Sequence, residues 1–361
     1  MIELRSDTFT LPPPRMRAAM VAAPLGDDVY GEDPTVNRLE RLAADRLGKP
    51  AACLMPSGTM SNLAALLAHA PRGTKALVGA ESDIYLYEAA GAAVCGGVSY
   101  EAVRNRADGT LALDDLAAGF PEDPDDPQFA RPAVICLENT QNRCGGVVLP
   151  PGYAAEVAAF AGERGVAVHL DGARLFNAAV ASGRPAAELA AHADSVQFCL
   201  SKGLRAPIGS LLVGSGRFVE AARRTRKMLG GGMRQAGVVA AAGIVALEEM
   251  VDRLADDHAL AARLAAGLAG IPGIAVDPEP RTNIVLFRVA DPRFTVDGFV
   301  AAAAAAGVRV GGFGHGRIRA VTHADVTAAG VDEALEVVDR LVRTGAGAPS
   351  GVDGRLSTVD G

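Results

Sequence analysis

The chain has 361 residues, of which 49% are hydrophobic and 21% are charged, a composition typical of an ordinary globular protein. The formal net charge of −7 argues against a dedicated nucleic-acid binder, which would need a basic surface to displace counterions. The longest apolar stretches are too short to cross a bilayer, and charged residues stand near the N-terminus where a secretory signal would be apolar. We therefore expect a cytoplasmic protein that binds neither nucleic acid nor membrane. The five cysteines have no C-x-x-C spacing, so a metal site or a disulfide framework is not expected.

Short apolar runs alternate with amphipathic stretches of helical period between about residues 35 and 240. The runs that we interpret as strands are Ala51–Met55, Lys75–Val78, Val134–Leu137, Val166–Leu170, Val196–Leu200 and Ser210–Val213. The helical stretches between them include Ser61–Ala68, Tyr153–Arg164 and Arg217–Lys227. This alternation predicts an α/β domain with a mostly parallel sheet.

The chain after about residue 235 has a different order of elements. A long helical stretch from Ala236 to Ala269 is expected to break near Asp256–Asp257. A strand, a helix, a second strand and a last helix follow, predicted at Ile284–Arg288, Val296–Ala306, Arg317–Val321 and Val331–Arg343. This order suits a small α+β domain.

These patterns divide the chain into four parts. We expect an N-terminal active-site segment at residues 1–14, a large domain at 15–240 and a small domain at 241–343. The tail at 344–361 is Gly-rich without periodicity and is expected to be disordered. The segment Pro121–Pro132 is rich in Pro and Asp and is predicted to be a surface loop.

Ligands of α/β sheets bind beyond the carboxyl ends of the strands, and three unusual features fall at such ends. The first is Lys202, which follows the apolar run Val196–Leu200 and precedes Gly203. A lysine placed there is poorly solvated, which lowers its pKa and favours an imine with an aldehyde cofactor. The alternative interpretation is a lysine that extends from the strand end to water.

The second feature is Asp171, which ends another apolar strand. A carboxylate beside a bound pyridine ring would keep the ring nitrogen protonated, and the protonated ring accepts electrons from a carbanion. Alternatively, Asp171 caps the next helix. His169 stands two positions earlier and therefore points to the same face of the strand, where it either supports the carboxylate or simply packs.

The third feature is the turn formed by Ser57, Gly58 and Thr59, which opens a predicted helix. Small residues at a helix N-terminus expose backbone N–H groups that bind phosphate, aided by the helix dipole. An ordinary capped helix start is the alternative. The three features together supply a lysine anchor, a partner for an electron sink and a phosphate cradle, and this combination is more specific than any one of them.

With these residues in place, the chain resembles the threonine aldolases, which belong to the β-eliminating lyase group of the fold-type I enzymes that use pyridoxal 5′-phosphate (PLP). The resemblance extends from about residue 2 to residue 340. The segments that carry it are Leu4–Thr8, Gly26–Thr35, Pro56–Thr59, Leu137–Thr140, Asp171–Arg174, Leu200–Gly203, Lys227–Gln235 and Arg319–His323. It implies a mostly parallel sheet of seven strands and a small C-terminal domain.

The resemblance also implies roles for the matching positions. Lys202 would hold PLP as a Schiff base, Asp171 would face the pyridine nitrogen, and the turn at Ser57, Gly58 and Thr59 would bind the phosphate. The substrate carboxylate would be held by Ser6, Arg174 and Arg319, where a planar guanidinium suits a bidentate grip. Arg174 is also implied to contact the cofactor. A structural ion pair for Arg174 and a solvated strand end for Arg319 remain the alternatives.

Two further residues are implied to act between subunits. Arg234 would help to bind the phosphate of a neighbouring subunit, and Tyr30 would reach into a partner's active site. The family forms homotetramers built from dimers with shared active sites, so we expect the same assembly for this chain.

The sequence departs from the family pattern at two positions. Asp83 and Gln141 stand where threonine aldolases carry histidines that lie near the cofactor ring and the substrate hydroxyl. The carboxylate of Asp83 could act as a base, and we count it as a catalytic and cofactor-contacting candidate. Gln141 can donate and accept hydrogen bonds but cannot titrate, so it is a candidate for substrate binding only.

The activity implied by the resemblance is cleavage of a β-hydroxy-α-amino acid, such as L-threonine or L-allo-threonine, to glycine and an aldehyde. A PLP-dependent transaldolase or a lyase that eliminates a β-substituent is the nearest alternative. A protein of this fold that only binds a partner is a third possibility, and the intact Lys202 argues against it.

Overall fold

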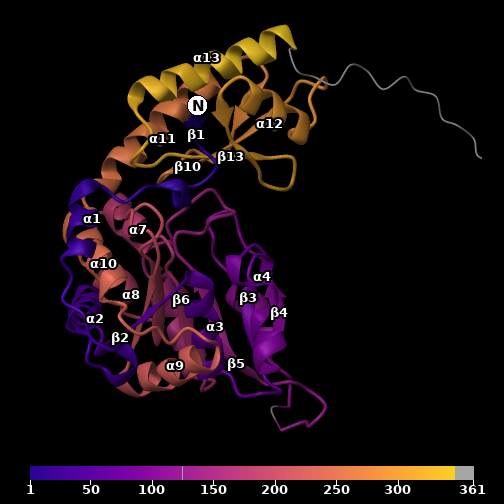
Figure 1. The fold of residues 1–361 in the computed structure, drawn as a ribbon. Helices are drawn as coiled ribbons and strands as arrows, with labels where there is room; N and C mark the ends of the chain where they lie inside the picture. Colours follow the sequence, from indigo (N-terminus) through magenta and orange to yellow (C-terminus); the bar gives the residue numbers. More distant parts are fainter. Residues whose placement is uncertain (124, 346–361) are drawn as a thin grey trace, which may run out of the picture.

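The computed structural model describes residues 1–123 and 125–345, which form a large α/β part and a smaller α+β part (Figure 1). The tail predicted to be disordered lies outside the described residues from position 346 onward. Among the helices described, none combines the length and the apolar character that crossing a membrane requires.

A seven-stranded sheet forms the centre of the large part, in the spatial order β2-β8-β7-β6-β5-β3-β4. Its strands are β2 (Ala51–Met55), β3 (Lys75–Gly79), β4 (Ser99–Val103), β5 (Pro132–Glu138), β6 (Ala167–Asp171), β7 (Ser195–Cys199) and β8 (Ser210–Gly214). Only β8 runs antiparallel to its neighbours, so the carboxyl ends of the other six strands meet at one edge. The predicted mostly parallel sheet is confirmed. Within this sheet the sequence prediction missed only β4, an edge strand in which Val103 alone is buried and which shows no apolar run.

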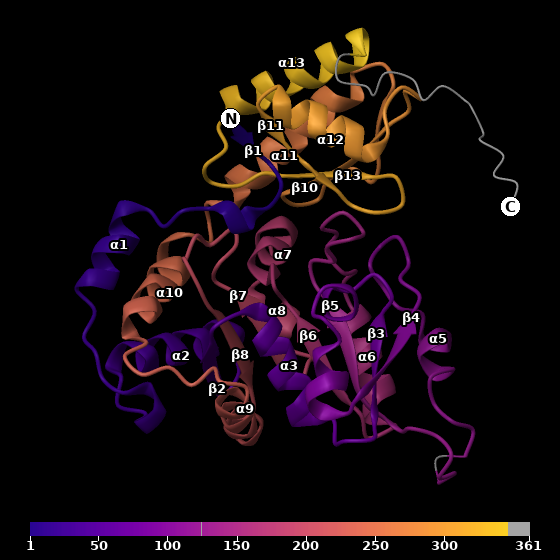
Figure 2. The same cartoon turned by 45° about the vertical axis from the view of Figure 1, so that its right-hand side comes forward.

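Helices cover this sheet, as two views of the ribbon show (Figures 1 and 2). They are α1 (Pro14–Val21), α2 (Pro34–Leu47), α3 (Gly58–His69), α4 (Asp83–Leu86), α5 (Leu113–Ala117), α6 (Tyr153–Gly162), α7 (Leu175–Ser182), α8 (Ala186–Ala190), α9 (Gly216–Met228) and α10 (Gly237–Glu249). The predicted helices at 61–68, 153–164 and 217–227 correspond to α3, α6 and α9.

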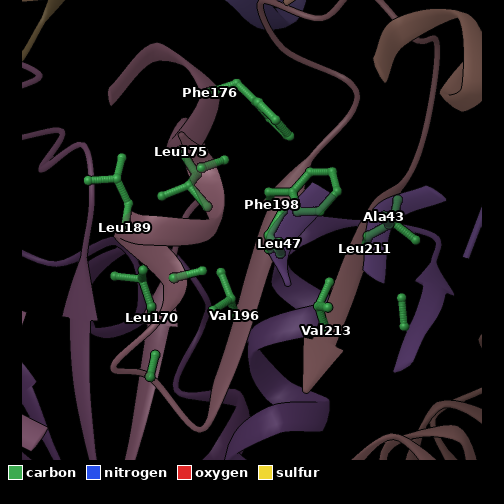
Figure 3. Close-up of a cluster of buried hydrophobic side chains, with 14 of the residues drawn as sticks. Ala43, Leu47, Leu170, Leu175, Phe176, Leu189, Val196, Phe198, Leu211 and Val213 are labelled. Carbon is green, nitrogen blue, oxygen red and sulfur yellow. The ribbon is translucent and has the colours of Figure 1, made fainter. Parts of the chain in front are cut away.

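The core between sheet and helices consists of buried aliphatic and aromatic side chains (Figure 3). Phe198 on β7 has no exposed surface and packs edge-on against Phe176 of α7, with the ring centroids 5.2 Å apart. Removing such a ring leaves a cavity and costs about 3–5 kcal/mol of stability. Packing of this kind fixes the strand ends on which the polar residues described below are carried.

The smaller part has its own core around a four-stranded antiparallel sheet. It contains α11 (Leu254–Ala269), β9 (Ile274–Val276), β10 (Ile284–Val289), α12 (Val296–Ala305), β11 (Val308–Arg309), β12 (Gly311–Gly312), β13 (Ile318–Val321) and α13 (Ala328–Thr344). The predicted strands and helices of this region are thereby confirmed. The N-terminal strand β1 (Ile2–Glu3) pairs with β11 and places Leu4 in this second core.

The expected break near Asp256–Asp257 is wrong, because both residues lie in the first turn of α11. Acidic side chains are favourable at the N-terminus of a helix, where they face the positive end of its dipole. The chain instead breaks between α10 and α11, at residues 250–253.

The position of α10 bears on the domain boundary. This helix packs against α1 and α2, and its buried residues belong to the core of the large part. The boundary expected at residue 241 falls inside it. We propose that the small domain begins with α11, at Leu254, and that β1 joins it from the other end of the chain.

Candidate active site

The carboxyl edge of the central sheet gathers the polar residues that follow its parallel strands. They are the Ser57 turn after β2, Asp83 after β3, Glu138 at the end of β5, Asp171 at the end of β6 and Lys202 after β7. The sequence reveals Lys202, Asp171 and the Ser57 turn because each follows a short apolar run, whereas Asp83 was singled out through the family resemblance and Glu138 was not singled out.

A cavity of about 350 Å³ opens above this edge, between the two parts of the molecule. Five of the residues singled out from the sequence line it: Ser6, Asp83, Arg174, Lys202 and Arg319. The other lining residues are Thr8, Tyr87, Asn142, Gly312 and Phe313. Residues from the N-terminal segment, the large part and the small part therefore meet in one place.

Lys202 is half-buried at the floor of this cavity. Burial by itself lowers the pKa of the lysine, but its interactions with Cys199, Asp83 and Asp7 outweigh burial and raise the pKa above its usual range. The sequence-based expectation of a lowered pKa is therefore wrong for the protein without a ligand, because that expectation considered solvation and not the neighbouring anionic groups.

Asp171 is almost completely buried and accepts three hydrogen bonds. The donors are Asn62 Nδ2 at 2.8 Å, Gln197 Nε2 at 2.5 Å and the backbone N–H of Ala173 at 3.0 Å. Burial raises the pKa of this carboxyl, and the charge of Lys202 opposes the rise. The contact with Ala173 N is the capping interaction expected from the alternative interpretation, and it coexists with the two side-chain donors.

The turn after β2 forms the N-terminus of the 12-residue helix α3. Ser57 is the N-cap, and its hydroxyl accepts from Met60 N at 3.1 Å. Gly58 and Thr59 belong to the first turn, where backbone N–H groups have no partner within the helix. A Cβ at Gly58 would lie 2.8 Å from Cys199 Sγ, so the glycine lets the helix start approach the end of β7, close to Lys202.

Arg174 is buried and forms a bidentate ion pair with Asp7, with both N–O distances 2.7 Å. The guanidinium holds the pKa of Asp7 well below its usual range despite complete burial. Asn283 Nδ2 also donates to Asp7, at 3.1 Å. Arg174 thus has the structural ion pair of the alternative interpretation, and it also lines the cavity.

Arg319 reaches the cavity from β13 of the small part. Its guanidinium donates to Asn142 Oδ1 at 2.8 Å and to the carbonyl oxygen of Arg5 at 3.1 Å, and it lies 4.3 Å from the ring centre of Phe313. Burial and the charge of Arg174 lower the pKa of Arg319 to about 10. Two neighbouring guanidinium groups in one cavity form a binding site for an anion such as a carboxylate.

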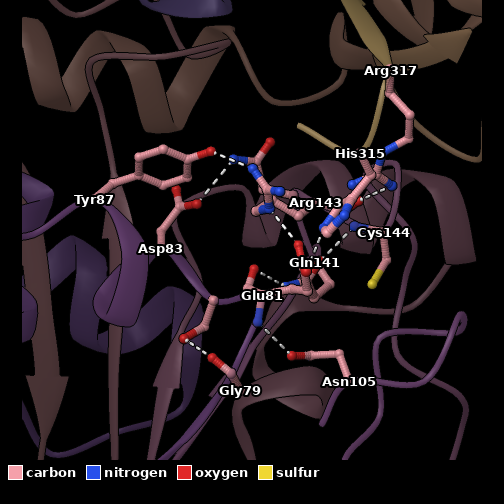
Figure 4. A network of polar contacts seen from close by, with 12 residues as sticks. Gly79, Glu81, Asp83, Tyr87, Asn105, Gln141, Arg143, Cys144, His315 and Arg317 are labelled. Carbon is pink, nitrogen blue, oxygen red and sulfur yellow. Dashed lines mark hydrogen bonds and ion pairs between the residues drawn. The ribbon is translucent and has the colours of Figure 1, made fainter. Parts of the chain in front are cut away.

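Asp83, which is drawn in Figure 4, follows β3 and lines the cavity. Its Oδ1 accepts a hydrogen bond from Asn142 Nδ2 at 3.0 Å, and its backbone N–H donates to Glu138 Oε2 at 2.8 Å. Burial, together with the charges of Asp83 and Asp171, raises the pKa of Glu138 well above its usual range. Asn142 thus connects Asp83 to Arg319.

Gln141 does not line the cavity, which differs from the sequence-based expectation. It is completely buried, its Nε2 donates to the carbonyl oxygen of Glu81 at 2.7 Å, and its Oε1 accepts from Cys144 N at 2.7 Å (Figure 4). Both ends of the amide are occupied by the backbone, so this side chain holds two loops together. The next residue, Asn142, points its amide into the cavity instead.

Tyr30 and Arg234 lie on the surface and outside the cavity. Tyr30 is 74% exposed at the end of a short helical turn, Asp28–Tyr30. Arg234 forms an ion pair with Asp27 at 2.9 Å, and its carbonyl oxygen accepts from Asp28 N. The two residues therefore belong to one surface region of the chain.

Sequence reasoning missed Asn142, Tyr87 and Phe313 as lining residues. Asn142 follows the end of β5 closely and could have been found by extending the strand-end argument a few positions. Tyr87 and Phe313 carry no such signal, because one lies after the short helix α4 and the other in a small-domain loop that only the tertiary structure brings over the sheet.

The fold is that of the fold-type I PLP-dependent enzymes. A Leishmania major threonine aldolase superposes with a TM-score of 0.78 at 20% identity, over 95% of this chain and all of that one. A structure described as a putative L-allo-threonine aldolase from Listeria monocytogenes gives 0.76 at 20% identity, over 94% and 96% of the two chains.

The chain belongs to the beta-eliminating lyase family, whose model matches residues 3–292. It is 50% identical over 293 residues to the low specificity L-threonine aldolase of Escherichia coli K12, which is 81% of this chain and 85% of that protein. It is 43% identical to the probable low-specificity L-threonine aldolase 2 of Arabidopsis thaliana, over 94% and 97% of the two chains. Members of this family use PLP as their cofactor.

Proposed function

We propose that this protein is a PLP-dependent aldolase that cleaves β-hydroxy-α-amino acids of the L-threonine and L-allo-threonine type to glycine and an aldehyde. The observation that carries the proposal is the cavity in which Lys202, two arginines and Asp83 meet at the carboxyl edge of the sheet. The names of the relatives that are 50% and 43% identical support the same activity.

The residues present fit PLP, because an amine, a buried carboxylate and a helix N-terminus surround one edge of the sheet. Lys202 would hold the aldehyde carbon, Asp171 would face the pyridine nitrogen, and Ser57, Gly58 and Thr59 would bind the phosphate. When bound, PLP supplies an electron sink for the negative charge that develops at the substrate Cα.

The substrate carboxylate would be bound by Arg174, Arg319 and Ser6. The ion pair with Asp7 fixes the Arg174 guanidinium, and Asn142 and Phe313 fix that of Arg319. Arginines held in place by the protein can orient the substrate so that the Cα–Cβ bond is the one that breaks. Orientation of this kind is one contribution that the chain itself makes to the rate.

Asp83 would take the proton from the β-hydroxyl group at its carboxylate oxygen. Asn142 donates to Oδ1, which leaves the other carboxylate oxygen, Oδ2, to face the substrate. We also propose a supporting role for Gln141, which holds the backbone of Glu81 two residues before Asp83. This replaces the direct substrate contact expected from the sequence.

We further propose a homotetramer in which Tyr30 and Arg234 act in the active site of a neighbouring subunit. Their exposure, and their place together on the surface away from the chain's own cavity, support this assignment. Sedimentation analysis should give four times the mass of the 361-residue chain. Mixing a Lys202→Ala variant with an Arg234→Ala variant should restore activity, because mixed oligomers contain some intact sites.

The activity is tested by incubating the purified protein with L-threonine, L-allo-threonine, phenylserine and a cysteine conjugate. Glycine with acetaldehyde or benzaldehyde means aldol cleavage, whereas pyruvate with ammonia means elimination. Transfer of the glycyl unit to an added second aldehyde would indicate a transaldolase. The proposal fails if no β-hydroxy amino acid yields glycine and an aldehyde.

The assignment of Lys202 has a separate test that does not need a substrate. Borohydride should fix PLP to the wild-type chain, and mass spectrometry should locate the adduct on Lys202. The Lys202→Ala variant should give no such adduct. An adduct on another lysine would contradict the assignment.

A further inference from the structure

A buried series of hydrogen bonds leads from the far end of helix α3 to the carboxylate of Asp171. His69 Nε2 lies 2.8 Å from Ser195 Oγ, and His169 Nδ1 lies 2.8 Å from the same oxygen. His169 Nε2 lies 3.0 Å from Asn62 Oδ1, and Asn62 Nδ2 donates to Asp171 Oδ2 at 2.8 Å. Ser195 and His169 are completely buried, and Asn62 is 1% exposed.

The chemistry of these groups fixes the direction of the bonds. The two N–H groups of Asn62 Nδ2 point to carboxyl oxygens, Oδ2 of Asp171 and Oε1 of Glu88, each at 2.8 Å. The other end of the amide, Oδ1, can only accept, so His169 must carry its proton on Nε2 and donate.

The directions of the remaining hydrogen bonds, those of Ser195, follow from the protonation state of the His169 imidazole. Burial lowers the pKa of His169 to about 3, so the ring is neutral and its Nδ1 accepts. The Ser195 hydroxyl has a single proton, which it donates to Nδ1, and it must therefore accept from His69 Nε2. Every donor in the series then points toward Asp171.

Resting on the proposed role of Asp171 toward the pyridine nitrogen, we propose that His169 is a positioning residue that acts through Asn62. It locks the Asn62 amide with its N–H groups toward Asp171, and so keeps that carboxylate ionised and aimed at the cofactor ring. Ser195 and His69 hold the imidazole in the required tautomer.

The effect of the Asn62 hydrogen bond on the pKa of Asp171 supports a role for His169 beyond packing. Burial raises the pKa of Asp171, and the hydrogen bond from Asn62 lowers it again. A reversed Asn62 amide would place a carbonyl oxygen against the carboxylate, exchanging an attraction for a repulsion. The neutral His169 is the group that excludes this reversal, because its Nε2–H requires an acceptor.

Two variants of similar size separate this role from packing. In His169→Gln the amide nitrogen can occupy the position of Nε2 and still donate to Asn62 Oδ1. In His169→Asn the shorter side chain mimics Nδ1, keeps the contact with Ser195 and loses the bond to Asn62. The measurements are the pH titration of the absorbance of bound PLP in the holoenzyme, the rate of PLP release on dilution, and the melting temperature.

We expect His169→Asn to shift the pH midpoint and to release PLP about tenfold faster, because an Asn62 amide that is no longer held in place loses its hydrogen bond to the charged Asp171 carboxylate. His169→Gln should resemble the wild type in both measurements, even if both variants lower the melting temperature equally. Equal behaviour of the two variants in the titration and in PLP release would overturn the inference.

If His169→Asn does not fold, Asn62→Leu provides the second test, since it removes the donor to Asp171 in a side chain of similar volume. It should also release PLP faster than the wild type, and release at the wild-type rate would refute the proposal. A wild-type protein that binds no PLP would instead refute the proposed function, so the two failures are distinguishable.

Discussion

Asp83 is held in place by the groups around it. It accepts a hydrogen bond from Asn142, and the nearby Glu138 has a pKa raised well above its usual range by burial and by Asp83 and Asp171. Among these carboxyls, the one that lines the cavity is Asp83. We therefore expect the Asp83 carboxylate to be the protein base that takes the β-hydroxyl proton.

Replacing Asp83 by Asn tests this at the residue scale. The variant can keep the contact with Asn142 through its own carbonyl oxygen, but it cannot take a proton. We expect kcat for L-threonine to fall by about 10²-fold or more, the usual contribution of a general base. PLP content, measured by absorbance, should stay near that of the wild type, and an unchanged kcat would show that another group serves as the base.

The start of helix α3 packs closely against β7 because Gly58 has no side chain. A Cβ on Gly58 would lie 2.8 Å from Cys199 Sγ, which belongs to β7, the strand that precedes Lys202. Gly216 occupies the same first helical position in α9, and a Cβ there would meet open space. Gly216 is therefore a suitable control position for substitutions of Gly58.

Gly58→Ala should push the helix start away from β7 and cost about 1–3 kcal/mol of stability, as overpacking does. We expect both a lower melting temperature and weaker PLP binding, measured by titration of the cofactor. Gly216→Ala should leave both nearly unchanged. Equal effects of the two substitutions would mean that the contact with Cys199 is not the cause.

The contact between helices α7 and α11 should make stability depend on pH. His258 of α11 lies 3.2 Å from the side-chain nitrogen of Asn177 on α7, and burial lowers its pKa to about 4. The unfolded chain binds a proton at this histidine near pH 6.5, whereas the folded chain does so only near 4. The resulting stability is fully present above pH 6.5 and is lost as the pH falls toward 4.

His258→Gln should remove this dependence. Between those two pH values, the stability of the wild type should fall relative to the variant by up to about 1.4 kcal/mol per pH unit. Urea unfolding at a series of pH values measures the difference, and the other titrating groups cancel in the comparison. Parallel pH profiles would contradict the assignment.

At the scale of the whole molecule, the first eight residues tie the two cores to the cavity. β1 pairs with β11, Leu4 is buried in the second core, and the carbonyl oxygen of Arg5 accepts a hydrogen bond from the Arg319 guanidinium. Ser6 and Thr8 then line the cavity. The N-terminus lies against the small part in both views, although most of the chain that follows it belongs to the large part (Figures 1 and 2).

Leu4→Ala should therefore affect stability and substrate binding together. We expect the free energy of unfolding to decrease by about 2–5 kcal/mol, which is typical for truncation of a buried leucine. We also expect a raised KM, because the segment that carries Ser6 and Asp7 is then held less firmly. Leu11→Ala is the control, since Leu11 is 67% exposed and such changes are usually within about 0.5 kcal/mol. A raised melting temperature or an unchanged KM for Leu4→Ala would contradict this coupling.

The sequence by itself determined the parallel sheet, four elements of the small part (β10, α12, β13 and α13) and the residues at the strand ends, including Lys202, Asp171 and the turn at Ser57–Thr59. These follow from local rules, because apolar periodicity sets the strands and the carboxyl ends of parallel strands share an edge. The tertiary structure decided the rest. Beside the adjacent Cys199, Asp83 and Asp7 from distant segments raise the pKa of Lys202 against the effect of burial, and the fold turns Gln141 into a buried brace while Asn142 faces the cavity. Both depend on packing between segments far apart in the chain, which no local pattern records.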